Sequence, residues 1–175
     1  VLDDLDQKCE ILIVDDGSTD DTLAQLRYWQ KTDSRVVIIK LSRNFGHQNA
    51  FNAGLDVAKG DAVIFMDGDL EDPPELIPEL VKNWLDGYDT VYTVKASRHQ
   101  PWFRKMLTRF YYRLLKSTTH YGIEPQSGMY SLVDEKVANV LRCMKESNKS
   151  YPNLRALAGF KQKAVFYSRD KRAYG

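Results

Sequence analysis

The sequence has few cysteines and no long apolar run. Its two cysteines, Cys9 and Cys143, lie far apart and form no CxxC pair, so neither a disulfide framework nor a zinc site is expected, and a reducing cytosol suits the chain. No stretch approaches the ~20 apolar residues of a membrane-spanning helix, and the opening VLDDLDQKCE is not typical of a signal peptide. The chain as given is therefore expected to be neither secreted nor inserted.

The sequence also has no large excess of either positive or negative charge. Lys plus Arg number 25 and Asp plus Glu number 24, so net charge indicates neither nucleic acid nor membrane as a partner. Apolar residues make up 43% and charged residues 28%, which is typical of a globular protein and argues against disorder. The 175 residues suffice for one domain, expected over 1–175.

Apolar strand patterns alternate with helical patterns. The strands are expected at CEILIVDD, RVVIIKLS, DAVIFMDGD and DTVYTVKA. In the first helix we expect Ser18 or Thr19 as the N-cap and Tyr28 and Trp29 as packing residues. Continuously apolar strands separated by helices predict an α/β fold, with a mostly parallel sheet flanked by helices.

Two acidic clusters follow the first and third of these strands. Asp15 and Asp16 end one strand, and Asp67 and Asp69 flank Gly68 after another. The carboxyl ends of parallel strands meet at one edge, where ligands bind. Two adjacent carboxylates cannot both cap the same helix, so Asp16 is expected to be free to bind a base or a ribose.

The second cluster predicts a site for Mg²⁺ or Mn²⁺. Asp67, Asp69 and the nearby Glu71 offer hard oxygen ligands, and Mg²⁺ is often held by one or two carboxylates plus substrate phosphates. Gly68 would let a ligand approach the backbone closely. The alternative is a solvated acidic turn in which Asp72 caps the next helix.

No acid occurs from Thr90 to Ile123, a span with seven Lys or Arg residues. Basic residues recur at helical spacing on one face, and apolar residues lie on another: Lys105, Arg109, Arg113 and Lys116 against Phe103, Met106, Leu107, Phe110 and Leu114. This pattern favours an amphipathic helix on anionic lipid, at about 98–120. A surface helix packed on the domain is the alternative, and the acidic edge opposes nucleic-acid binding.

Five stretches in this order resemble family 2 glycosyltransferases of the GT-A fold, and more closely the polyprenyl-phosphate glycosyltransferases, such as dolichol-phosphate mannose synthase: ILIVDDGSTDDT, LSRNFGHQNAFNAGLDVAKGD, FMDGDLEDPPELIPEL, SGMYSLVDEKV and SRDKRAYG. The resemblance covers nearly the whole chain. It implies an inverting enzyme that moves a hexose from a UDP- or GDP-sugar to a polyprenyl phosphate, with Mg²⁺ or Mn²⁺, at the cytoplasmic face of a membrane. A homo-oligomer is compatible with it.

The resemblance also implies roles for particular residues. The nucleotide would meet Asp15, Asp16, Asp67 and Gly68, with Asp16 on the base. The metal would meet Asp67, Asp69 and Glu71. The catalytic residues would be Asp67, Asp69, Arg169 and Arg172, the arginines belonging to an R-x-x-G region that ends at Gly175 and helps the diphosphate leave. The stretch Glu124–Leu132 falls where relatives carry an acceptor-side loop.

The chain departs from the family pattern in three ways. The family's first strand, with its Pro-x-Tyr-Asn-Glu turn, is absent, so an incomplete domain is expected. Many bacterial relatives have G-D-F-R-L where this chain has Met129 and Ser131 at the acid and arginine positions. The chain also stops before a Ser-Lys pair and before the transmembrane helices that full-length relatives often carry.

Two other functions fit parts of the same pattern. Transfer to a sugar hydroxyl in a polysaccharide would use the same fold. A receiver-like phosphoswitch, or a membrane-docking module without activity, belongs to another class; the basic segment has no role in a receiver.

Overall fold

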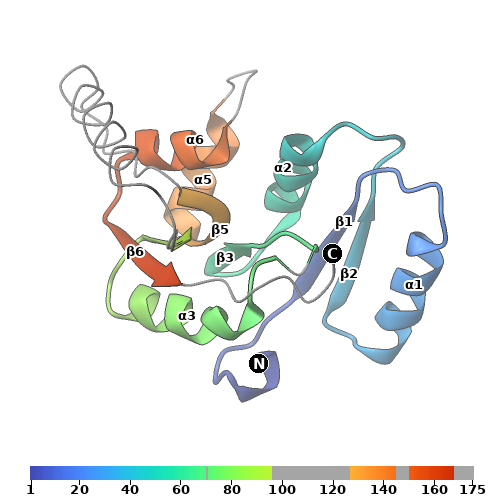
Figure 1. Cartoon of the computed structure of the whole chain (residues 1–175), viewed down its shortest axis with the longest axis horizontal. Coiled ribbons are helices and arrows are strands. Elements are labelled where there is room, and N and C mark those ends of the chain that lie inside the picture. Colours follow the sequence, from blue (N-terminus) through green and yellow to red (C-terminus); the bar gives the residue numbers. More distant parts are fainter. Residues whose placement is uncertain (70, 96–126, 145–149, 168–175) are drawn as a thin grey trace, which may run out of the picture.

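The fold comes from a computed structural model, which describes residues 1–69, 71–95, 127–144 and 150–167 (Figure 1). The strands are β1 (Ile11–Asp15), β2 (Val36–Lys40), β3 (Ala62–Phe65), β4 (Thr90–Lys95), β5 (Ser127–Asp134) and β6 (Gln162–Tyr167). The helices are α1 (Thr22–Thr32), α2 (His47–Val57), α3 (Ile77–Leu85), α5 (Glu135–Cys143) and α6 (Tyr151–Ala158), with 3-10 turns at Leu2–Asp4 and Pro74–Leu76. Within those ranges no helix has both the length and the apolar character needed to cross a bilayer.

The strands form two sheets. β1 and β2 pair in parallel, and the other four strands lie in the order β3-β5-β4-β6. The expected α/β class is confirmed, and so are its first four strands. In the four-stranded sheet β3, β4 and β6 run in one direction and β5 alone is reversed, antiparallel to both β3 and β4, so the expected mostly parallel sheet is confirmed with one exception. Ser127 pairs with Val94, so β5 begins beside the end of β4 and has to run back along it.

Both edge strands of each sheet, β1 and β2 in one and β3 and β6 in the other, lack a second strand partner in the described residues. β1 pairs there only with β2, and β3 only with β5. The additional first strand that the family resemblance predicts is compatible with these edges and stays a prediction.

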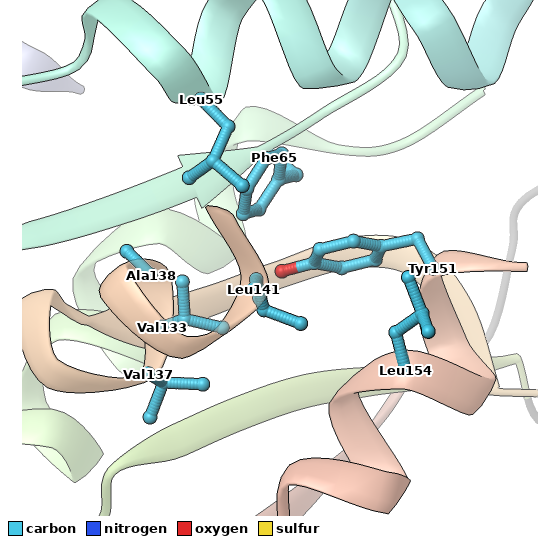
Figure 2. Close-up of a cluster of buried hydrophobic side chains, with 8 residues drawn as sticks. All are labelled: Leu55, Phe65, Val133, Val137, Ala138, Leu141, Tyr151 and Leu154. Atoms are coloured by element: carbon cyan, nitrogen blue, oxygen red, sulfur yellow. The ribbon is translucent and has the colours of Figure 1, made fainter. Parts of the chain in front are cut away.

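Helices cover both faces of the four-stranded sheet (Figure 1). On one face α3 buries Ile77, Leu80 and Val81 against side chains of β4, β5 and β6. On the other face α2, α5 and α6 enclose a second cluster, made of Leu55, Phe65, Val133, Val137, Ala138, Leu141, Tyr151 and Leu154 (Figure 2). The two clusters alternate along β5, as the period of two along a strand requires.

Two local expectations about α1 are wrong. The helix begins at Thr22, with Asp21 at the N-cap position, rather than at Ser18 or Thr19. Ser18 instead belongs to the turn after β1, where its backbone N–H donates to Asp15. Tyr28 and Trp29 are 66% and 61% exposed and contact each other edge to face, so they do not pack into the core.

At the end of the sheet remote from the acidic clusters, Asp89 joins three elements. Its carboxylate accepts from the Lys161 N–H (3.0 Å) and lies 2.6 Å from the Lys136 ammonium. The hydrogen bond from Lys136 is the main cause that lowers the pKa of Asp89 below its usual value. Because an acid with a lowered pKa stabilises the fold above its unfolded pKa, this contribution should disappear as the pH falls through the folded pKa.

We predict that Asp89→Asn lowers the free energy of unfolding by about 1 kcal/mol at neutral pH. The difference from the parent should begin to shrink below about pH 4, the pKa of an unfolded Asp, and should vanish once the pH falls below the lowered pKa of the folded carboxyl. Urea unfolding of the intact protein at several pH values would measure it. Asp86→Asn, at an exposed acid nearby, is the control and should stay within about 0.5 kcal/mol of the parent. A loss for Asp89→Asn that is independent of pH would contradict the ionic origin.

Candidate active site

The carboxylate of Asp15 is buried at the end of β1. It is 4% exposed, and its Oδ1 accepts from the Ser18 N–H at 2.9 Å. Its Oδ2 is also buried and has no hydrogen-bond partner within the described ranges of the chain. A buried acceptor without a donor is costly, so this oxygen is suited to a donor group that arrives with a ligand.

Asp16 binds the start of α2 with both carboxylate oxygens. Oδ1 accepts from the Phe45 N–H at 2.7 Å, and Oδ2 accepts from the Gly46 N–H at 2.9 Å. The expectation that Asp16 is free of capping contacts is therefore wrong: it supports α2 rather than the helix that follows it in sequence. Each oxygen keeps a further lone pair, and contact of Asp16 with a base stays a prediction.

Gly17 brings two loops into backbone contact. It has φ +76°, a conformation that favours glycine, and a Cβ there would lie 2.4 Å from the carbonyl carbon of Arg43. The loop after β1 thus packs directly on the loop between β2 and α2. Because the two loops are in contact, the Asp16 carboxylate lies within hydrogen-bond distance of the Phe45 and Gly46 N–H groups.

His47, the first residue of α2, connects the two acidic clusters. Its Nε2 lies 2.6 Å from Oδ1 of Asp67. Asp16 therefore holds the residues just before α2, and the next residue holds Asp67. The expectation that both clusters meet at one edge is confirmed by these contacts.

The three proposed metal-side carboxylates do not converge. Asp69 Oδ1 accepts from the Glu71 N–H at 2.8 Å, while the Glu71 carboxylate lies 3.7 Å from the Lys95 ammonium. In the part of the chain that the structure describes, no three His, Cys, Asp or Glu side chains are placed to hold a metal ion. Asp67 and Asp69 nevertheless flank Gly68, whose Cα faces open space. Two carboxylates beside open backbone suit a hard cation that takes its other ligands from phosphates and water.

Asp72 secures the loop that carries these residues. It is 5% exposed, accepts from the Tyr167 hydroxyl at 3.1 Å and lies 3.6 Å from the Lys95 ammonium. The Tyr130 hydroxyl donates to the Pro73 carbonyl at 3.0 Å. The expectation that Asp72 caps the next helix is therefore wrong, because this carboxylate is buried and bound to residues at the ends of β4 and β6.

Lys95, Tyr130 and Tyr167 did not stand out in the sequence as loop-holding residues. Tyr130 and Tyr167 lie on β5 and β6, which the strand pattern did not predict. An Asp followed by two prolines directly after the acidic cluster was the available signal that the loop has a fixed shape.

The other predicted site residues lie outside the described ranges. These are Arg169, Arg172 and Gly175, the first three residues of the acceptor-side stretch Glu124–Leu132, and the basic segment at about 98–120. Arg169 follows two residues after Tyr167, the last residue of β6, and Lys95 and Tyr167 are register partners at the ends of their strands. We call the edge formed by the carboxyl ends of β3, β4 and β6 and by the start of β5 the rim.

Known proteins resemble this chain over most of its length. Residues 1–142 match glycosyl transferase family 2. An uncharacterized glycosyltransferase of Bacillus subtilis, YkcC, is 43% identical over 176 residues, which is 100% of this chain and 54% of the relative. An undecaprenyl-phosphate 4-deoxy-4-formamido-L-arabinose transferase of an Enterobacter species is 44% identical over 111 residues, 63% of this chain and 34% of the relative. The chain thus spans about half the length of the first of these, and less of the second.

A solved structure has a similar fold. The mannosyltransferase PcManGT of Pyrobaculum calidifontis, in complex with GDP-Man and Mn²⁺, matches with a TM-score of 0.60 at 19% identity, over 94% of this chain and 49% of that one. Likeness at this identity shows the fold, so the GT-A architecture expected from the sequence is confirmed. Together with the family match over residues 1–142, it establishes that the chain belongs to glycosyl transferase family 2.

Proposed function

We propose that the chain is the catalytic region of an inverting glycosyltransferase, which moves a hexose from a nucleotide-sugar to a polyprenyl phosphate. The observation that carries the proposal is the meeting of two acidic clusters at the start of α2, through Asp16 with Gly46 and His47 with Asp67. Similarity to an undecaprenyl-phosphate sugar transferase supports the choice of acceptor.

The donor would lie across the two clusters. Asp15 offers a buried carboxylate oxygen without a donor, suited to an N–H of the base or a hydroxyl of the ribose. Asp67 and Asp69 would hold Mg²⁺ or Mn²⁺, which would supply positive charge to the departing diphosphate. Arg169 and Arg172 would add charge to the same phosphates. Glu71, beside Lys95, has a weaker claim as a metal ligand than Asp67 and Asp69.

The reaction places modest demands on a general base. A phosphate monoester has a second pKa near ~6, so the acceptor is largely a dianion at neutral pH and acts as its own nucleophile. Its oxygen would form the bond to the anomeric carbon while the bond from that carbon to the nucleoside diphosphate breaks on the opposite face. No proton has to be removed, which is consistent with Met129 at the position where many relatives have an acid.

We predict that Asp69→Asn removes the Mn²⁺-dependent part of nucleoside diphosphate binding and leaves the fold intact. The Asp69 side chain is exposed, and among the described residues it accepts only from the Glu71 N–H, so stability should change by no more than about 0.5 kcal/mol. Calorimetric titration of the intact protein, with and without Mn²⁺, measures the effect. Asp56→Asn makes the same charge change at an exposed position of α2 and should bind like the parent. Unchanged metal-dependent binding in Asp69→Asn would refute the metal assignment.

The base of the donor is open between uracil and guanine. A ligand that binds only the folded state raises the melting temperature by mass action. Melting curves with UDP, GDP and their hexose derivatives, each with and without Mn²⁺, would identify the donor. A panel in which none of them shifts the melting temperature would argue against a nucleotide-sugar site.

The segment at about 98–120 is proposed, from its sequence, to dock on anionic lipid. Each basic residue near such a surface contributes about 1 kcal/mol, so replacing Arg109 and Arg113 with Glu should weaken vesicle binding at least ~30-fold. Sedimentation of the intact protein with phosphatidylglycerol vesicles at two salt concentrations measures it, since screening should weaken the parent too. Equal pelleting of parent and variant, or pelleting that salt does not affect, would identify an ordinary surface helix. Nucleotide binding is the control and should persist.

A further inference from the structure

A guanidinium is buried under α6 without an ionic partner. Arg155 is 2% exposed. Its Nη1 donates to the Gly128 carbonyl at a long 3.5 Å, and its buried Nε–H has no acceptor among the residues that the structure describes. In the described part of the chain, no carboxylate lies within ion-pair distance of it. Burial lowers the pKa of Arg155, although a guanidinium stays charged under ordinary conditions.

Two tyrosine rings hold this guanidinium in place. Its central carbon lies 4.5 Å from the centre of the Tyr92 ring and 5.9 Å from that of Tyr151. Rings can replace only part of the water that a buried cation loses, because cation–π contacts give about 2 kcal/mol and a buried unpaired ion costs several. The described residues around Arg155 therefore leave its charge without a counter-ion, and a bound anion would supply one.

The guanidinium reaches the start of β5, which belongs to the rim, two strands away from the strand that leads into the D-x-D loop. Ser131 on β5 pairs with both Phe65 on β3 and Tyr92 on β4, so these three residues form one row across the sheet. Phe65 is two residues before Asp67, and Arg155 stands over Tyr92 at the other end of the row. Neighbouring strands are about 4.8 Å apart, so the two ends are roughly 10 Å apart.

One face of α6 spans that row. Tyr151 lies 4.5 Å from the Phe65 ring, centre to centre (Figure 2), and Arg155 follows one helical turn later. Burial raises the pKa of Tyr151, and the Arg155 charge and the Ser131 hydroxyl partly oppose that rise. The rings of Phe65 and Tyr151 therefore lead from the strand before Asp67 to the guanidinium of Arg155.

We propose that Arg155 binds the phosphate of the acceptor, a polyprenyl phosphate, through its Nε–H and Nη groups. This inference rests on the proposed function and adds a binding residue to it. Planar guanidinium donors match the oxygens of a phosphate in pairs, which a lysine or an amide cannot reproduce.

Its position favours the acceptor over the donor. The donor diphosphate belongs with Asp67 and Asp69, and Arg155 is roughly 10 Å away across β5. β4 ends at Lys95, and β5 begins at Ser127, the residue before Gly128, whose carbonyl accepts from Arg155. The basic segment proposed to meet lipid is thus joined at both of its ends to the strands beside Arg155.

The test compares Arg155→Gln and Arg155→Lys with the parent in the intact protein. The probes are a short-chain prenyl phosphate and the matching prenyl alcohol, with Mn²⁺ and the nucleoside diphosphate measured separately. A charge-assisted hydrogen bond contributes about 1.5–3 kcal/mol, so Arg155→Gln should weaken prenyl phosphate binding about 10- to 100-fold. Binding of the alcohol and of the nucleotide should change less than about twofold, a split that a general loss of structure would not produce.

Arg142→Gln is the matched control. Arg142 is also an anchored arginine under this helix layer, but its donors are satisfied by the Leu55 and Ala58 carbonyls, so its loss should not separate phosphate from alcohol. If Arg155→Gln does not fold, Arg155→Lys decides, because it keeps a cation and should weaken prenyl phosphate binding several-fold.

Four outcomes would overturn the inference. Prenyl phosphate affinity that neither variant changes would show that Arg155 does not bind it. Loss of nucleotide and phosphate binding together would place Arg155 in the donor site or the core. A crystal structure of the intact protein in which a carboxylate of the same chain occupies the guanidinium would identify a structural ion pair. A parent that binds the phosphate no better than the alcohol would instead refute the proposed acceptor, and the inference with it.

Discussion

The bond between the Asp16 carboxylate and the start of α2 is the constraint on which the candidate site depends. Backbone N–H groups at a helix start lack partners within the helix and carry partial positive charge. Asp16 satisfies those of Phe45 and Gly46, and this fixes α2 relative to the end of β1. His47 then reaches Asp67 at the end of β3. Two strands that are not hydrogen-bonded to each other in the described residues are thereby joined through one helix start.

The D-x-D loop is held at its other end by a buried carboxylate. Burying Asp72 would be unfavourable without partners, and the Tyr167 hydroxyl and the Lys95 ammonium provide them. The loop is therefore fixed on both sides of Gly68, which itself faces open space. Carboxylates placed before the ligand arrives need little reorganisation when negative charge develops on a leaving diphosphate. The contacts that hold the fold together at this edge thus also prepare the site.

The sequence was informative where structure is local and misleading where a side chain binds a distant one. Four apolar runs gave β1 to β4 because buried strands need only their own composition. The helix that Asp16 supports is not the next one in the chain: its partner Phe45 is 29 residues away. Asp72 likewise bonds Tyr167, 95 residues away, instead of capping the helix after it. The antiparallel course of β5 is set by its pairing with β3 and β4, and no pattern in the sequence predicted that strand.

The two positions on β5 that depart from the family pattern, Met129 and Ser131, and the buried arginine lie on the same side of that strand. Met129 and Ser131 are two residues apart, so both face the layer that contains α6. Met129 packs against the buried cluster, and the Ser131 hydroxyl donates to the Met129 carbonyl, so neither brings charge to the rim. Arg155 brings it from the helix instead. A guanidinium held between two tyrosine rings has already lost most of its rotamer freedom, and that entropy is not lost again on binding. A positive charge supplied by Arg155 on α6, in place of an arginine on β5, would therefore preserve an anion site at the rim and leave β5 to pack as an apolar strand.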